Sequence, residues 1–116
     1  MYSSRGDAGA FLAYPYIYNS SGEWIGFVTA GREVYSVLGY YVGYLTEERR
    51  ILRERTPRVP KEPVEPPPEP PRIKVQSTIP LAPMMSELTY STVDVLLEEP
   101  ERLHTLDVGE LRQDLD

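Results

Sequence analysis

The sequence repeats with a period of seventeen residues, and this repeat restricts the possible folds more than any other feature. Residues 18–28 align with residues 35–45, so that a tyrosine, two glycines and several apolar residues recur at equal spacing. The same offset relates Ile17, Val34 and Ile51. Two complete units and the opening strand of a third are therefore visible, and a short internal repeat indicates a repeated supersecondary unit.

Each unit has the pattern of a β-hairpin, because β-branched and aromatic residues flank a four-residue turn. The turns at 19–22 and 36–39 begin with Asn or Ser and end with glycine, which accepts a positive φ. Gly31 is expected to serve the connection between the two units. We expect an antiparallel meander whose strands span 13–18, 24–29, 33–37, 41–46 and 49–54.

Two glycines, Gly26 and Gly43, lie inside the expected strands, where glycine weakens pairing. Their recurrence in both units predicts either a bulge or a bare stretch of backbone that an aromatic ring covers. The glycines with a turn or backbone role are Gly22, Gly26, Gly39 and Gly43.

Both faces of the expected sheet are apolar or aromatic. Strict alternation places Tyr16 and Tyr18 opposite Ile17. It also places Ile25 and Phe27 on one face. A domain this small cannot bury two such faces alone, so we expect a homo-oligomer, with a tetramer as one form. The residues assigned to the repeat core or the oligomer contact are Ile17, Tyr18, Trp24, Ile25, Phe27, Val34, Tyr35, Val42, Tyr44 and Ile51.

The pattern Tyr-x-x-x-Gly-x-x-[Ile/Val]-Gly-[Phe/Tyr], given twice within residues 14–55, resembles the bacterial four-fold beta flower domain. The resemblance covers about a third of the chain. It implies a bacterial origin and an oligomeric or pseudo-symmetric arrangement of hairpins, and it implies no catalytic residue. A PRC-barrel is the main alternative, because its opening hairpin carries a similar Gly-x-x-[Ile/Val]-Gly. Choline-binding repeats fit less well, since their paired tryptophans and longer period are missing.

Composition divides the chain of 116 residues into segments. We expect a flexible N-terminus over 1–12 and a neutral repeat domain over 13–56, which holds seven of the nine tyrosines. A proline-rich linker over 57–72 and an acidic tail over 73–116 follow, and the tail holds the whole net charge of −6. The expected fold class is all-β: a small antiparallel meander of repeated hairpin units, followed by this linker and a largely irregular tail with a short helix.

The linker has proline at every third position from Pro57 to Pro66. A polyproline II helix has three residues per turn, so these prolines align on one edge. Extended in this way, the linker would span roughly 50 Å. Residues 67–72 also match a P-x-x-P-x-R ligand pattern for aromatic grooves. A stiff spacer is the favoured interpretation.

The tail contains an amphipathic segment over 92–99. Ser91 or Thr92 is expected to cap a helix whose early Asp94 favours its positive end, and Pro100 ends it. Such a segment either docks on its own domain, a neighbouring copy or another protein, or stays disordered. The residues expected to dock are Met84, Met85, Leu88, Val93, Leu96 and Leu97.

The chain offers little for catalysis. It has no cysteine, which excludes disulfides, thiolate metal sites and a cysteine nucleophile. A single histidine, His104, excludes multi-histidine metal sites, and no nucleophile is framed beside it. We therefore expect no enzyme, no metal and no cofactor. The acidic balance argues against nucleic acid, and no apolar run could cross a membrane. Without a signal peptide pattern, a cytoplasmic location is expected.

These features predict a non-enzymatic oligomerisation or scaffold module, or a protein-interaction module whose tail meets a protein partner. The alternative, from another functional class, is a binding module for a carbohydrate or small ligand. Tyrosine and tryptophan suit such a surface because each has an apolar ring and a polar group. The residues assigned to this aromatic platform are Tyr16, Trp24, Tyr40 and Tyr41.

Overall fold

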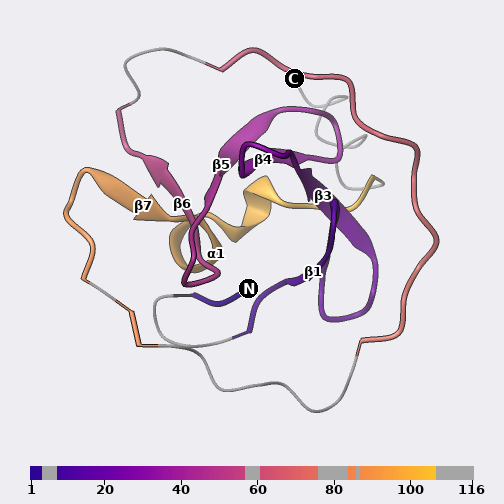
Figure 1. The fold of residues 1–116 in the computed structure, drawn as a ribbon, viewed down its shortest axis with the longest axis horizontal. Helices are drawn as coiled ribbons and strands as arrows, with labels where there is room; N and C mark the ends of the chain where they lie inside the picture. The colour runs from indigo at the N-terminus through magenta and orange to yellow at the C-terminus, as the bar shows by residue number, and fades with distance from the viewer. Residues whose placement is uncertain (4–7, 57–60, 76–83, 86, 107–116) are drawn as a thin grey trace.

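A computed structural model describes residues 1–3, 8–56, 61–75, 84–85 and 87–106. The strands in these ranges form one seven-stranded antiparallel sheet in sequential strand order, drawn in Figure 1. The strands are β1 (Phe11–Ala13), β2 (Tyr16–Tyr18), β3 (Trp24–Val28), β4 (Glu33–Ser36), β5 (Tyr41–Leu45), β6 (Ile51–Glu54) and β7 (Thr92–Asp94). The helical elements are α1 (Val95–Glu98) and the 3-10 turn η1 (Pro100–Arg102). The expected all-β class with a short helix is therefore confirmed. In these ranges, no helix has the length and apolar character to cross a membrane.

The β2–β3 hairpin contains a bulge. Ile17 pairs with Gly26 and Tyr18 pairs with Trp24, which leaves Ile25 as an extra residue on β3. The extra residue shifts the alternation of β3. As a result, Ile25 packs in the same apolar cluster as Ile17, whereas Trp24 packs with Tyr18 in a second cluster.

The β4–β5 hairpin repeats this arrangement seventeen residues later. Val34 pairs with Gly43 and Tyr35 pairs with Tyr41, so Val42 is the extra residue on β5. A bulge was one of the two roles predicted for the strand glycines, and both hairpins confirm it.

The sheet carries an apolar cluster on each face. The aliphatic cluster consists of Met1, Ala10, Ile17, Ile25, Val28, Val34, Val42, Ile51, Val95 and Leu103. The aromatic cluster consists of Tyr18, Trp24, Phe27, Tyr35 and Val37. Phe27 and Ile25 thus belong to different clusters. The expectation that they share a face is wrong, because strict alternation does not continue across a bulge.

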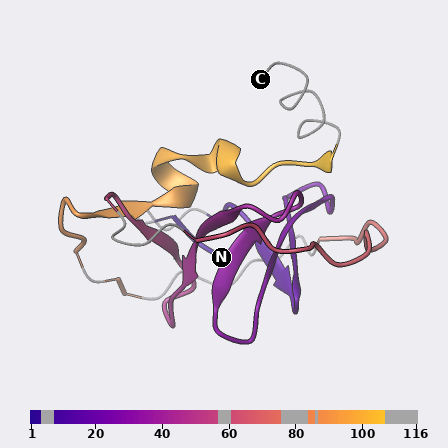
Figure 2. The same cartoon turned by 90° about the horizontal axis from the view of Figure 1, so that it is seen from above.

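Segments from both ends of the chain cover the aliphatic cluster. Figure 2 shows α1 and η1 lying across one face of the sheet, and Val95 and Leu103 from this layer are buried in the cluster. The Met1 amine donates to the Ala10 carbonyl at 2.7 Å. The Tyr2 N–H donates to the Arg49 carbonyl at 2.8 Å. Residues 1–3 and 8–10 are therefore held against the sheet, and residues 11–12 belong to β1, so the expected flexible N-terminus is wrong for them.

The tail supplies the last strand of the sheet. β7 pairs with β6, with Leu52 opposite Asp94, although residues 55–91 separate the two strands. The sheet thus extends beyond the range 13–56 expected for the repeat domain. Only the second half of the expected helix 92–99 is helical. Asp94 is its N-cap and accepts from the Leu97 N–H, in place of the expected Ser91 or Thr92.

The N-terminal residues form one more hairpin of the same kind. Tyr2 bridges to Ala8, and the partners are six positions apart, as they are for Tyr18 with Trp24 and Tyr35 with Tyr41. The described residues therefore include four successive hairpins, the last of which is β6–β7. The residues that open these hairpins all meet in the aliphatic cluster; they are Met1, Ile17, Val34 and Ile51.

The described part of the proline-rich segment, residues 61–75, runs around the periphery of the sheet (Figure 1). It contacts the turns of the two central hairpins in the same way. The Val64 N–H donates to the Gly39 carbonyl at 2.9 Å, and the Ile73 N–H donates to the Gly22 carbonyl at 3.0 Å. Ile73 also packs on the aromatic cluster. This segment is thus bound to the sheet along its length and does not project from it.

Candidate functional site

The repeat residues predicted for core or oligomer contacts are buried within the single chain. Nine of the ten belong to the two clusters and expose 7 % or less of their surface. Tyr44 is the exception, with 36 % exposed. The prediction that the aromatic face needs a second chain assumed that nothing else covers it. Here Ile73 and Leu106 of the same chain pack on it.

The four aromatic residues predicted as a ligand platform do not form one open surface. Trp24 is buried, and its indole N–H donates to the Gly26 carbonyl at 2.7 Å. Tyr16 lies edge-on to Trp24 with 6.1 Å between ring centroids. Tyr41 is half-buried, and only Tyr40 is exposed. An open stacking face for a sugar is therefore lacking at these four positions.

The structure divides the residues predicted for tail docking into two groups. Val93 is buried, and Leu96 packs against the aliphatic cluster, so these two dock on their own sheet. The others lie on a different surface. Met85, Leu88 and Leu97 line a cleft of about 510 Å³, and Met84 is 98 % exposed. We call this the tail cleft and take it as the candidate functional site.

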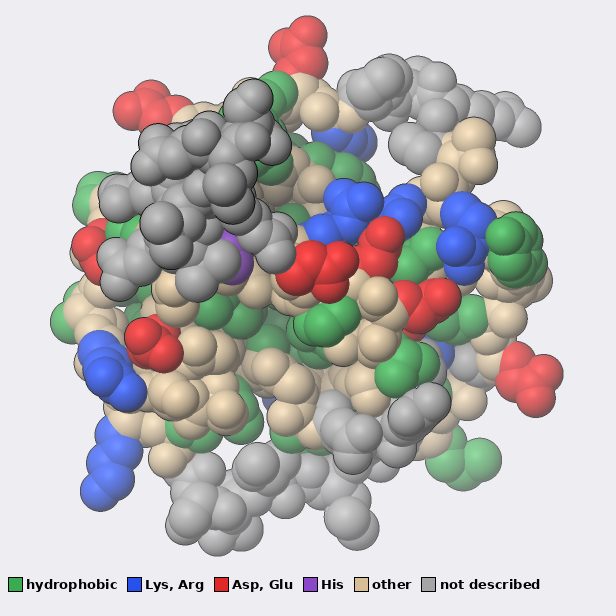
Figure 3. All heavy atoms as spheres, turned by 180° about the vertical axis from the view of Figure 1, so that it is seen from behind, with side chains coloured by type: hydrophobic (Ala, Val, Ile, Leu, Met, Phe, Trp, Pro, Cys, Tyr) green, Lys and Arg blue, Asp and Glu red, His purple; other side chains and the backbone are tan. Residues whose placement is uncertain are grey.

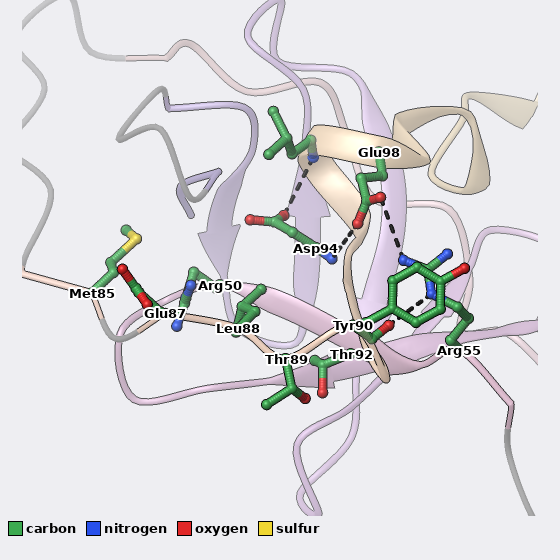
Figure 4. Close-up of a pocket in the computed structure, with 11 residues that line it drawn as sticks. Arg50, Arg55, Met85, Glu87, Leu88, Thr89, Tyr90, Thr92, Asp94 and Glu98 are labelled. Carbon is green, nitrogen blue, oxygen red and sulfur yellow. Dashed lines mark hydrogen bonds and ion pairs between the residues drawn. The ribbon is translucent and has the colours of Figure 1, made fainter.

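The tail cleft lies between β6, α1 and the chain that returns to β7, as the close-up in Figure 4 shows. Arg55, just after β6, holds the returning chain in three ways. Its backbone N–H donates to the Ser91 carbonyl at 2.7 Å, and its Nε donates to the Tyr90 carbonyl at 2.8 Å. Its guanidinium also lies 4.3 Å from the centroid of the Tyr90 ring, in a cation–π contact. Glu98 completes this wall, 3.6 Å from Arg55 Nη2.

Two buried charged residues, Arg50 and Asp94, also line the tail cleft, each about 1 % exposed. Arg50 Nη2 donates to Glu48 at 2.8 Å. Asp94 accepts from the Leu97 N–H at 3.3 Å, and its own N–H donates to Glu98 at 3.4 Å. These bonds hold α1 at the end of β7 (Figure 4). Asp94 thus fixes the wall of the cleft that α1 forms.

A network of ion pairs joins β6 to α1 and η1. Arg53 Nη2 donates to Glu99 at 2.8 Å, and Arg102 Nε lies 2.9 Å from the same carboxylate. The hydrogen bonds from Arg53 are the main reason that the pKa of Glu99 is lowered to about 2; partial burial opposes this shift. Figure 3 shows basic and acidic side chains side by side on one face of the molecule. The network pairs opposite charges: Glu99 contacts both Arg53 and Arg102, and Glu98 contacts Arg55.

In the part of the chain that the structure describes, no group of three or more His, Asp or Glu side chains could hold a metal ion. His104 is half-buried, and its Nδ1 lies 3.0 Å from the Thr105 carbonyl oxygen. The tail cleft combines apolar side chains with the ion pair between Arg55 and Glu98.

Arg55 and Tyr90 hold the tail cleft together, and both were missed from the sequence. Tyr90 is the one tyrosine of the nine outside residues 1–56. That isolation from the repeat was the available signal. Arg55 carried no signal, because its partners lie 35 residues or more away in the chain.

Models of known protein families, curated proteins and solved structures were all compared with the chain, and none matches it.

Proposed function

We propose that this chain is a non-enzymatic protein-interaction module that associates with a second copy of itself through the tail cleft. The observation that carries the proposal is a group of large apolar side chains held in contact with water at one place. Tyr90, which is 82 % exposed, and Leu97, which is 36 % exposed, both line the cleft. Met85 and Leu88 extend the same surface into the cleft. Apolar side chains that gather on a surface in this way are typical of protein contacts.

The location of this surface differs from the one that the repeat suggested. The aliphatic cluster is covered by α1 and Leu103, and the aromatic cluster by Ile73 and Leu106. Association through either face would require the displacement of the chain's own segments. Contact through the tail cleft leaves both clusters intact, which favours the cleft as the interface.

A two-fold contact suits the geometry of the tail cleft. In such a contact the same patch is used by both copies, so an exposed ring on one copy can enter the cleft of the other. Tyr90 stands at the edge of the cleft on a guanidinium that limits its motion. A pre-positioned tyrosine loses little conformational entropy on binding and buries a large apolar area.

The four successive hairpins, together with the repeated motif, support the proposal that the chain is a four-fold beta flower domain. In that case the four-fold arrangement arises within one chain, since the opening residues of all four hairpins share one cluster. Four chains are then not needed to build it. Self-association through the tail cleft would come in addition.

Sedimentation equilibrium on the full chain tests the proposed interface. We expect the wild-type chain to form a dimer as its concentration rises. Leu97→Ser and Tyr90→Ser should each weaken the dimer, because they remove apolar area from the contact. Neither side chain belongs to the two clusters, so the sheet should stay folded.

Tyr40→Ser is the matched control, because Tyr40 is also an exposed tyrosine but lies in the turn between β4 and β5. The control should dimerise like the wild type. A wild-type chain that stays monomeric at every concentration would refute the proposal, as would equal losses in all three variants.

A further inference from the structure

A second cleft, with a volume of about 570 Å³, lies on the other side of the hairpin repeat from the central turns. Its walls come from β1, from the end of β5 and from the turn that connects β5 to β6. Phe11, Leu12 and Leu45 supply an apolar side. Arg32 and Arg49 supply two guanidinium groups. We call it the arginine cleft. Its volume falls in the range of small-molecule sites.

The two arginines occupy equivalent and unfavourable backbone positions. Arg32 has φ 63° and Arg49 has φ 61°, and they are the non-glycine residues of the described ranges with positive φ. Each sits in a five-residue turn whose first residue is a threonine. Thr29 Oγ1 accepts from the Glu33 N–H at 3.3 Å, and the second turn repeats this bond. Glycine or asparagine is the usual choice at such a position, since other side chains cost about 1 kcal/mol or more.

The strained conformation does not serve a contact made by the side chains. Neither Arg32 nor Arg49 forms a side-chain hydrogen bond or ion pair with any residue in the ranges that the structure describes. Their carbonyls are used instead: Arg32 accepts from the Leu45 N–H and Arg49 from the Tyr2 N–H, both at 2.8 Å. The backbone of each arginine is therefore fixed, and glycine would satisfy the same bonds. What glycine could not supply is the guanidinium group that each arginine places in the cleft, and this accounts for the strained backbone.

The charge of the cleft is positive. One carboxylate, that of Glu47, lines it together with the two guanidinium groups. The positive charge of Arg49 also acts on the Met1 amine nearby. Burial is the main cause that lowers the pKa of this amine to about 6, and the charge of Arg49 lowers it further. The apolar side is open to solvent, since Leu12 is 43 % exposed. Positive charge and accessible apolar surface thus meet in one cavity.

We propose that the arginine cleft binds an amphipathic organic anion. The anionic group, a carboxylate or a phosphate, is held between Arg32 and Arg49, and the apolar body lies on Phe11, Leu12 and Leu45. Guanidinium groups suit this role because they form paired hydrogen bonds with carboxylate and phosphate oxygens. Because Arg32 and Arg49 lie on separate turns, their guanidinium groups can contact one anion from two sides. This site is independent of the tail cleft, which shares no lining residue with it.

Isothermal titration of the full chain with decanoate tests the site, and inorganic phosphate serves as the probe without an apolar body. We expect decanoate to bind and phosphate alone to bind at least tenfold more weakly. Arg32→Gly and Arg49→Gly should each reduce decanoate affinity at least about tenfold, because each removes one charge-assisted contact. The same two changes should raise the melting temperature, since glycine relieves the positive φ. A purely structural arginine would give the opposite shift in melting temperature.

Arg32→Gln removes the charge and keeps the backbone strain, so it should lose affinity without gaining stability. Lys74→Gln is the control for net charge, because Lys74 is exposed on the proline-rich segment outside the cleft; it should bind as the wild type does. The proposal is overturned if Arg32→Gly and Arg49→Gly keep their affinity. It is also overturned if Lys74→Gln weakens binding equally, or if phosphate binds as well as decanoate.

Discussion

At the scale of single residues, the chain uses left-handed backbone at equivalent positions of its hairpin turns but fills these positions differently. Gly22 and Gly39 have φ 80° and 87°, as the turn pattern predicts. The connection between the repeat units was expected to rely on Gly31, but the residue with positive φ is Arg32. The spacing of the repeat predicts where the turn lies, but it does not predict which residue of the turn has a positive φ. That residue is decided by the hydrogen bond of the Thr29 side chain.

Gly39→Ala should lower the stability of the fold by about 2 kcal/mol. A Cβ at this position would lie 1.9 Å from the Val64 carbonyl oxygen, so the proline-rich segment would have to move. The positive φ adds about 1 kcal/mol of strain. Chemical denaturation measures the change, and Gly31→Ala is the control, since its Cβ would meet nothing closer than 3.8 Å. A stability of Gly39→Ala equal to that of the control would contradict this close approach.

Glu99 should make the fold sensitive to acid. Its pKa is lowered to about 2, chiefly by the hydrogen bonds from Arg53. The folded state therefore holds its carboxylate more strongly than the unfolded state does, where the ordinary pKa is 4.5. The stabilisation is complete above pH 4.5 and is lost as the pH falls toward 2.

Glu99→Gln tests this dependence, and we expect a loss of about 1–2 kcal/mol at pH 7. The difference between variant and wild type should shrink as the pH falls from 4.5 to 2, as followed by thermal unfolding. Glu62→Gln makes the same charge change on an exposed residue and should match the wild type throughout. A difference from wild type that stays constant with pH would contradict the assignment.

At the scale of elements, the repeat predicted the central strands well because their pairing is local. β3, β4 and β5 lie within the expected ranges 24–29, 33–37 and 41–46. The expected strand 13–18 is instead two strands, β1 and β2, with a turn between them. The N-terminal hairpin was missed because Ala8 and Ala10 stand where the next unit has Trp24 and Gly26, which hides the motif.

The strand β7 and the short α1 were not predictable from local pattern. The stretch around Val93 shows helical spacing of apolar residues, but its strand partner Arg53 lies 40 positions earlier. Pairing with an existing strand outweighs a weak helix preference, since a helix of this length is unstable alone. The tail cleft could not be predicted for the same reason, because its walls meet only after β7 has paired.

Val95→Ala should cost about 2 kcal/mol, because Val95 is fully buried in the aliphatic cluster where β7 becomes α1. Leu97→Ala should change stability by less than about 0.5 kcal/mol, since that side chain is 36 % exposed. Denaturant titration of both variants compares them directly. The amphipathic pattern read from the sequence places Leu97 on the docking face and omits Val95. Equal costs for the two variants would favour that pattern over the observed packing.

At the scale of the whole molecule, the proline-rich segment can be understood as an insertion into the turn of the fourth hairpin. The two central hairpins close through four-residue turns, whereas β6 and β7 are joined by residues 55–91. The pairing is nevertheless that of an ordinary hairpin, with Glu54 opposite Thr92. The insertion then runs back over the turns of the earlier hairpins. In this arrangement the sheet holds the insertion, and the insertion covers the aromatic cluster.

Replacement of residues 56–90 by the turn Asn-Ser-Ser-Gly, copied from residues 19–22, tests this view. Arg55 and Ser91 are already hydrogen-bonded at 2.7 Å, so a short turn can join them. We expect the shortened chain to keep its β circular dichroism and cooperative unfolding, with lower stability, because β6–β7 pairing does not depend on the insertion. Trp24 should emit at longer wavelength, since the aromatic cluster loses the cover of Ile73, and a peptide of residues 61–75 added in trans should reverse the shift. Loss of cooperative unfolding would mean instead that the insertion is needed to assemble the sheet.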